Sequence, residues 1–144
     1  MSTVVDPTYG NAADFNGANG HLEIEDISDL VIDASRTYSV WIRFDAVTKT
    51  SFLSMANNST WLWLLGTSNA NGPLYVQVKT GVSGFVADNP SAGTWYHIVS
   101  TYDISTFLNT MYVDSVLEAS IATEITEATD DKLHVGNLGS SGPI

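Results

Sequence analysis

The chain of 144 residues lacks cysteine and carries few positive charges. Without cysteine, neither a disulfide framework nor a thiolate metal site can form. Lys and Arg total 5 against 16 Asp and Glu, which gives a formal net charge of −11. Binding to DNA or RNA needs a basic surface, so we expect no nucleic-acid partner.

Long apolar runs and a secretory pattern are missing as well. No stretch of roughly 18 apolar residues occurs, so we expect no membrane-spanning helix and no membrane partner. The first ten residues contain no basic segment followed by an apolar one, so no signal peptide is visible. Charged residues make up 15% and hydrophobic residues 44%, a composition that excludes a disordered chain, a coiled coil and a collagen. The length is typical of one domain, which we place at residues 1–144.

Alternation with a period of two predicts β-strands throughout the chain. The clearest examples are residues 37–44, 74–79, 94–103 and 107–114. Both faces of residues 94–103 are fairly apolar, which predicts a central strand. Shorter strands are expected at residues 13–15, 21–25, 52–56, 61–65, 116–121 and 132–136, with one helical turn near 26–30. Clusters of Asn, Gly and Pro separate these segments, so the sequence predicts an all-β fold of two antiparallel sheets packed face to face.

Five segments resemble, in order along the chain, the laminin-G-like (concanavalin A-like) jelly-roll family. They are ADFNGANGHLEIED, TYSVWIRFD, GTWYHIVSTYD, MYVDSVLEAS and LHVGN, and they span residues 13–137. The resemblance implies a two-sheet antiparallel jelly-roll sandwich. Ser115 stands where the family prefers Gly, which predicts a turn of a different type. The family's usual last strand has no counterpart in the remaining LGSSGPI. Either that strand is missing, or residues 1–9 or a neighbouring chain supply it.

Aromatic residues are the predicted ligand-binding groups. Trp61 and Trp63 lie on one face of the segment WLWLL, shortly after Asn57 and Asn58. An exposed indole can stack on a sugar ring while polar side chains hydrogen-bond its hydroxyls. The alternative is that these tryptophans fill the core of the sandwich. Trp41 and Trp95 lie in segments that match the family's core strands, so we expect both to be buried.

Glu23, Glu25 and Asp26 form the most prominent carboxylate cluster. The resembling family includes glycoside hydrolases, which carry paired carboxylates on one concave strand. Glu23 and Glu25 share a strand face, but Ile27 and Ser28 follow Asp26, and no third carboxylate completes the family's catalytic spacing. We therefore expect a solvated strand face, no catalytic residues and no enzyme activity.

Oxygen-rich loops are candidates for calcium, which laminin-G-like domains often bind through carboxylates and carbonyls. The alternative is that these side chains only solubilise the loops. His97 is expected at the edge of the core, and the three histidines show no metal-ligand spacing, so no zinc site is expected. The predicted calcium ligands are Asp88, Asn89, Asp130 and Asp131, with Asp103 at a strand end.

The resemblance leaves several functions open, because this fold hosts many. The leading hypothesis is a non-catalytic surface decoration or adhesion module, a structural protein on a virus (phage) particle that also has the capacity to bind glycans. A phage protein needs no secretion signal, and a missing strand invites completion by neighbouring subunits of a homo-oligomer or capsid. The alternative is a free-standing, lectin-like carbohydrate-binding module, and a glycoside hydrolase is the third hypothesis. The predicted location is the virion surface or the extracellular space.

Overall fold

The structure, a computed structural model, describes residues 2–6, 10–15, 20–25, 27, 34–48, 50–56, 61–68, 70–78, 82–85, 88–125 and 132–136. These residues form strands, turns and loops and contain no helix. The strands are β1 (Ser2–Asp6), β2 (Gly10–Asp14), β3 (Leu22–Ile24), β4 (Arg36–Arg43), β5 (Thr50–Ala56), β6 (Trp61–Thr67), β7 (Leu74–Val78), β8 (Val82–Phe85), β9 (Trp95–Asp103), β10 (Leu108–Val113), β11 (Val116–Ala122) and β12 (Lys132–Val135). Within the described ranges, no helix has the length and apolar character that crossing a membrane requires.

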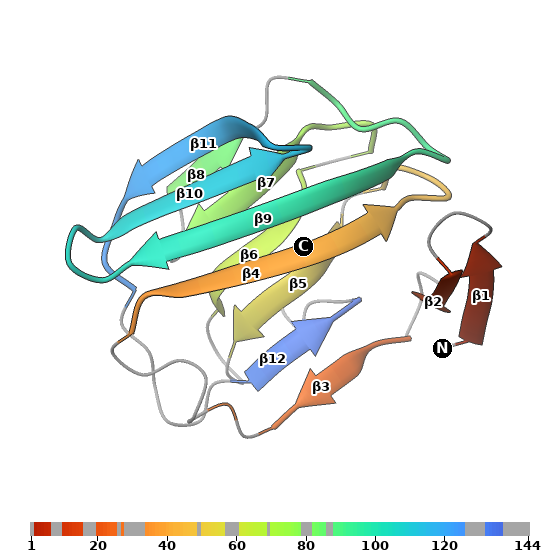
Figure 1. Cartoon of the computed structure of the whole chain (residues 1–144), viewed down its shortest axis with the longest axis horizontal. Coiled ribbons are helices and arrows are strands. Elements are labelled where there is room, and N and C mark those ends of the chain that lie inside the picture. The colour runs from red at the N-terminus through yellow and green to blue at the C-terminus, as the bar shows by residue number, and fades with distance from the viewer. Residues whose placement is uncertain are drawn as a thin grey trace.

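The strands build two stacked antiparallel sheets (Figure 1). The four-stranded sheet has the order β11-β10-β9-β4 and faces the viewer in Figure 1. The six-stranded sheet has the order β3-β12-β5-β6-β7-β8 and lies behind it. β1 and β2 pair with each other in a hairpin beside the sheets. The predicted all-β, two-sheet antiparallel jelly-roll sandwich is therefore confirmed.

Alternation along each strand decides which side chains enter the space between the sheets. In β4, Tyr38, Val40 and Ile42 pack against the core, while the residues between them are exposed. β7 alternates in the same way, and its three apolar side chains are buried. The core is built from both sheets and includes Phe44, Phe52, Trp63, Leu65, Leu74, Val76, Val78, Ile98, Tyr102, Met111 and Val113. Burial of this apolar surface, at about 25 cal/mol per Å², is the main stabilising contribution.

The two sheets come close together where β8 meets β11. A Cβ atom placed on Gly84 of β8 would lie 2.9 Å from Cβ of Ala119 and 3.2 Å from the side chain of Ile121. Real carbon atoms do not approach that closely, so a side chain at position 84 would push β11 away. Glycine at this position therefore lets one long side of the sandwich close.

Most of the expected strands correspond to observed ones, with ends shifted by a few residues. β9 lies between β10 and β4, as its two apolar faces predict. Residues 1–9 were one candidate for the missing last strand, but β1 pairs with β2 in a sheet of its own. β8 was not expected, because its sequence VSGF is short and contains Ser and Gly, which weaken a strand pattern. The helical turn expected near 26–30 lies outside the described residues, apart from Ile27, which is buried.

The turn between β10 and β11 has two central residues, because Val113 pairs with Val116. Asp114 has a φ of 49° and Ser115 has a φ of 74°. Positive φ at both central residues characterises the type I′ hairpin, which favours glycine at this point. Ser115 therefore occupies a glycine-favouring conformation, and the expectation of a different turn type is wrong.

Candidate functional site

The outward face of the four-stranded sheet presents an exposed aromatic residue among polar ones. Trp41 is 48% exposed and lies on β4 between Ser39 and Arg43, which point to the same side. The strand register places Trp41 directly opposite His97 of β9. The two rings stack with their centroids 4.7 Å apart and their planes at 17°. The imidazole therefore supports the indole on one side, while about half of Trp41 stays open to solvent.

His97 is fixed from two further directions. Its Nε2 atom lies 2.8 Å from the Ser39 hydroxyl, across the strand pair. Its backbone N–H donates to Oδ1 of Asp114 over 2.9 Å, and its carbonyl accepts from the Asp114 N–H over 2.9 Å. The β10–β11 turn is thus attached to the start of β9. Ser39 holds the His97 side chain and Asp114 holds its backbone. The ring on which Trp41 stacks is therefore fixed in place.

Arg43 and Trp95 continue this face toward one end of the sheet. They are direct partners in the ladder, and the guanidinium carbon lies 5.7 Å from the centre of the Trp95 ring. Nη2 of Arg43 is also 3.6 Å from Oδ1 of Asp45. The positive charge therefore has an aromatic and an acidic neighbour.

Hydroxyl groups continue the face in the other direction. Thr101 of β9 and Thr110 of β10 are ladder partners, and their hydroxyl oxygens are 2.6 Å apart. Thr37 of β4 pairs with Thr101 from the other side. The four-stranded sheet therefore presents imidazole, indole and hydroxyl groups from neighbouring strands. We call the surface formed by Ser39, Trp41, Arg43, Trp95, His97 and Thr101 the Trp41 face.

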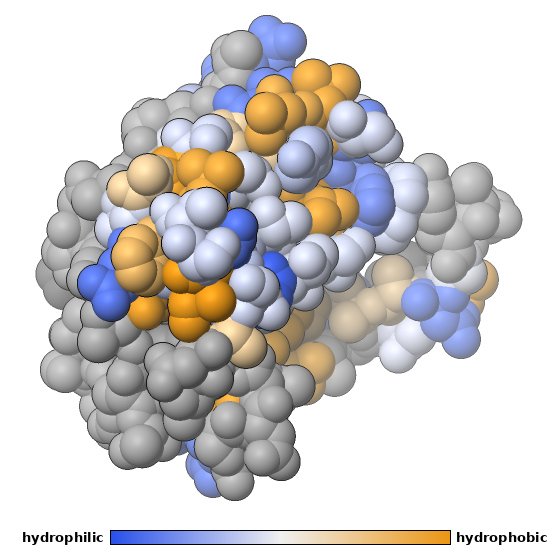
Figure 2. All heavy atoms as spheres, turned by 60° about the vertical axis from the view of Figure 1, so that its left-hand side comes forward, coloured by the Kyte–Doolittle hydropathy of each residue, from blue (hydrophilic) through white to orange (hydrophobic). Residues whose placement is uncertain are grey.

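Among the described residues visible in Figure 2, exposed hydrophobic side chains lie apart from one another. Figure 2 shows hydrophobic side chains in separate patches with polar side chains between them. Phe107, Val116 and Leu117 are exposed at or near the turns on either side of β10. Scattered apolar residues of this kind are normal on a protein surface. The Trp41 face differs because its aromatic residue has ordered polar partners.

The expectation that Trp41 is buried is wrong. Tyr38, Val40 and Ile42 occupy the inward positions of β4, so Trp41 at an alternate position must point outward. Trp95 is half-buried beneath Arg43 and is not a core residue either. The alternation of β4 was the signal that identifies Trp41, because it groups the tryptophan with Ser39 and Arg43.

Trp63, which was predicted to bind a ligand, belongs to the core. It is 1% exposed, and its ring stacks on Tyr38 with the centroids 4.4 Å apart. A ring covered on this scale cannot meet a sugar, so the prediction for Trp63 is wrong and the core alternative holds. The backbone of Trp61 opens β6, but its side chain lies outside the described part of the structure. Asn57 and Asn58 also lie outside the described residues, so their predicted role stays a prediction.

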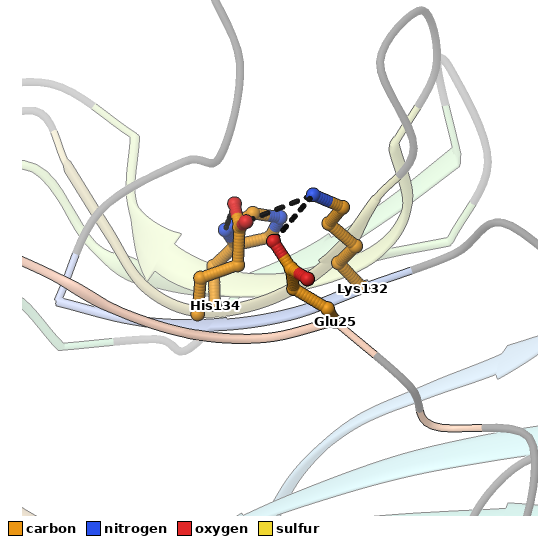
Figure 3. A network of polar contacts seen from close by, with 4 residues as sticks. Glu25, Lys132 and His134 are labelled. Carbon is orange, nitrogen blue, oxygen red and sulfur yellow. Dashed lines mark hydrogen bonds and ion pairs between the residues drawn. The ribbon is translucent and has the colours of Figure 1, made fainter.

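A second polar cluster lies on the outward face of the six-stranded sheet, where β3 pairs with β12 (Figure 3). Lys132 Nζ is 2.9 Å from Oε1 of Glu23 and 3.7 Å from Oε1 of Glu25. Oε2 of Glu23 lies 3.4 Å from Nδ1 of His134, a side chain that is 3% exposed. Figure 3 shows Glu25, Lys132 and His134 on the same side of the sheet. The prediction that Glu23 and Glu25 share a face is confirmed.

Charge pairing sets the protonation of this cluster. The hydrogen bond from Lys132 lowers the pKa of Glu23 below its ordinary value near 4.5, against a smaller opposing effect of desolvation. The same bond raises the pKa of Lys132 above its ordinary value near 10.5. Both groups are therefore charged at neutral pH. The sequence did not indicate this cluster, because β3 and β12 are far apart along the chain.

The predicted calcium ligands are only partly within the described residues. Asp88 and Asn89 are exposed, and Asp130 and Asp131 lie outside the described ranges. Asp103 accepts hydrogen bonds from the backbone and hydroxyl of Ser105, which lower its pKa. Among the described residues, no three His, Asp or Glu side chains gather as a metal site. The calcium set therefore stays a prediction.

Comparison with known proteins identifies a family and a similar solved structure. A family model described as the concanavalin A-like lectin/glucanases superfamily matches residues 16–143. Among curated proteins, no sequence matches the chain.

Domain 4 of AbnA, a GH43 extracellular arabinanase from Geobacillus stearothermophilus, is similar in structure, with a TM-score of 0.67 and 16% sequence identity. That domain was solved in complex with arabinotriose. The alignment covers 94% of this chain and 66% of that chain, so this chain spans just under two thirds of its length. At this identity, the likeness concerns the fold alone.

Proposed function

The chain belongs to the concanavalin A-like lectin/glucanase superfamily, and from this membership we propose that it is a non-catalytic module that binds a glycan through the Trp41 face. The proposal depends on one observation, the exposed indole of Trp41 held between ordered polar partners. The apolar face of a sugar ring stacks on an indole, while its hydroxyls bond to nearby hydroxyl and imidazole groups. Ser39 and His97 offer such groups beside Trp41.

The solved relative agrees with this class of ligand. Domain 4 of AbnA was solved in complex with arabinotriose, which is a short glycan. The family description covers both lectins and glucanases, so membership alone leaves binding and hydrolysis open. The choice between them depends on the carboxylates.

The environment of Glu23 favours binding over hydrolysis. Glycosidases need one carboxyl group that stays protonated near neutral pH, with a pKa raised by its surroundings. Lys132 has the opposite effect on Glu23, and it also contacts Glu25. Nucleophilic catalysis by a serine is the other possibility, because Ser54, His134 and Glu23 lie in one row across β5, β12 and β3. Ser54 is fully buried, however, so its hydroxyl is not available to a substrate.

Replacement of Trp41 tests the proposal. Trp41→Ala should abolish retardation of the protein in native gels that contain a neutral polysaccharide. Phe107→Ala is the matched control, because Phe107 is also an exposed aromatic residue but lies at the β9–β10 turn. Circular dichroism should show that both variants stay folded. Equal retardation of wild type and Trp41→Ala in every gel would refute glycan binding at this face.

A role in assembly is the second candidate, and the β1–β2 hairpin favours it. Val5 is 73% exposed on β1, and the hairpin forms a sheet of its own. An isolated two-stranded hairpin is marginally stable in water, so packing on a second copy of the chain would stabilise it. Decoration of a virus particle, and a place on its surface or outside the cell, remain proposals on this basis.

Light scattering coupled to gel filtration tests the assembly role. Wild type should elute as an oligomer, and Val5→Ser should shift it toward the monomer while circular dichroism shows that the protein stays folded. A wild-type protein that stays monomeric over a wide concentration range would contradict self-association through the hairpin.

A further inference from the structure

We infer that the Trp41 face selects uncharged glycans over glycans that carry carboxylate or sulfate groups. This inference rests on the proposed function and adds the chemical class of the ligand. It comes from the placement of charge on the four strands of the sheet. Anionic glycans are held by Arg and Lys side chains that are free to pair with them.

The four strands supply very few cations. Arg36 and Arg43 are the only Lys or Arg residues in β4, β9, β10 and β11. Arg36 belongs to the inward set of β4, and its guanidinium carbon lies 4.9 Å from the centre of the buried Tyr102 ring. Its charge is therefore directed away from the Trp41 face.

Arg43 is the one cation on the Trp41 face, and Asp45 offsets it. The Arg43 guanidinium lies 3.6 Å from the Asp45 carboxylate, whose side chain is 84% exposed. A carboxylate on a ligand would have to compete with Asp45 for Arg43 and would meet repulsion from Asp45 itself. Two unit charges at this separation attract each other only weakly in water, so competition from Asp45 removes most of the attraction that Arg43 could offer to a ligand.

A second acidic residue, Asp114, lies beside the Trp41 face. Asp114 lies against the backbone of His97, and its other contacts among the described residues include no Lys or Arg within ion-pair distance. The whole chain carries a formal net charge of −11, which repels polyanions at long range in low salt. An uncharged ligand avoids both the local repulsion from Asp114 and the long-range repulsion from the net charge.

The polar groups that remain suit hydroxyls. The Ser39 hydroxyl with the His97 imidazole, and the Thr101 hydroxyl with that of Thr110, each contain both a donor and an acceptor. Sugar hydroxyls also donate and accept, so they can join these pairs without leaving a charge unpaired. Stacking on Trp41 requires the apolar face of the ring and no charge.

Matched polymers test the inference with the whole chain. Hydroxyethylcellulose is paired with carboxymethylcellulose, and dextran with dextran sulfate; neutral arabinan, xylan and galactan complete the panel. Affinity electrophoresis at low and high NaCl gives a dissociation constant for each polymer. We expect at least one neutral polymer to bind wild type but not Trp41→Ala, with an affinity that salt leaves unchanged. The charged polymers should bind at least tenfold more weakly in low salt.

Asp45→Asn sharpens the test, because it removes the negative charge beside Arg43 and leaves Trp41 unchanged. Binding of carboxymethylcellulose in low salt should rise roughly fivefold in this variant, the factor that about 1 kcal/mol represents, while neutral binding stays unchanged. Asp45→Asn combined with Arg43→Gln should lose that gain.

The two hypotheses fail in different ways. If wild type binds a charged polymer at least as tightly as its neutral partner, and salt weakens this binding, the selectivity is refuted while glycan binding stands. If no polymer of the panel binds, the proposed function is refuted and the selectivity with it.

Discussion

Replacement of Trp63 by Ala should strongly destabilise the folded protein. The side chain is 1% exposed and stacks on Tyr38 from the opposite sheet with ring centroids 4.4 Å apart. Removal of a buried tryptophan costs about 3–5 kcal/mol, a sum of lost burial and the cavity left behind. For a domain of this length each kcal/mol lowers the melting temperature by roughly 2–4 °C, so we expect a fall of roughly 6–20 °C.

Trp41→Ala is the control for Trp63→Ala, because it removes an exposed tryptophan instead of a buried one. Trp41 loses its stacking on His97, an interaction worth about 1 kcal/mol, and leaves no cavity because the ring is half exposed. Urea denaturation followed by far-ultraviolet circular dichroism measures both variants on one scale. If Trp41→Ala is as destabilising as Trp63→Ala, then Trp41 is a core residue, and the assignment of inward and outward faces of β4 is wrong.

Three further changes probe the turn, the ion pair and the sheet contact. Ser115→Gly should raise the free energy of unfolding in urea by about 1 kcal/mol, because glycine adopts positive φ with less strain; Asp114→Gly, which also loses a bond to β9, should give no such gain. Because the pKa of Glu23 is lowered in the folded state, the Glu23–Lys132 pair stabilises the protein above the ordinary pKa near 4.5. This stability is lost as the pH falls through the lowered pKa. In Lys132→Met, the melting temperature should therefore fall less steeply at acid pH than in wild type, which flattens the acid limb of its pH profile. Parallel acid limbs would contradict the pairing. Gly84→Ala should destabilise the protein by roughly 1–3 kcal/mol in urea, and an unchanged midpoint would mean that β11 lies farther away than described.

Local periodicity predicted the strands well because burial on one face leaves a period of two in the sequence. It also contained the correct orientation of Trp41, between Ser39 and Arg43. The resemblance to a family strand with a central tryptophan suggested the core instead, and the physical pattern proved the better guide. In β6 the opposite problem arises, since WLWLL is apolar on both faces. Periodicity alone could not decide which face Trp63 would occupy.

The Glu23 cluster shows a different limit of sequence reasoning. Alternation indicates that Glu23 and Glu25 lie on the same face of β3. It indicates separately that Lys132 and His134 lie on the same face of β12. Nothing local indicates that β3 and β12 pair, because the hydrogen bond between Glu23 and Lys132 joins residues 109 positions apart. Neighbouring strands that are distant along the chain are fixed by the topology of the whole sheet, which a single sequence pattern does not contain.

The hydrogen-bonded pairing of β4 with β9 affects the affinity of the Trp41 face for a ligand. Trp41 and His97 stand on backbone that is already ordered, so association freezes few additional rotations. One indole still offers a small contact area, so in the proposed role a single copy of the chain dissociates quickly from a glycan. Several copies mounted side by side would rebind before all had released, so the density of sugars on the opposing surface would govern how long attachment lasts.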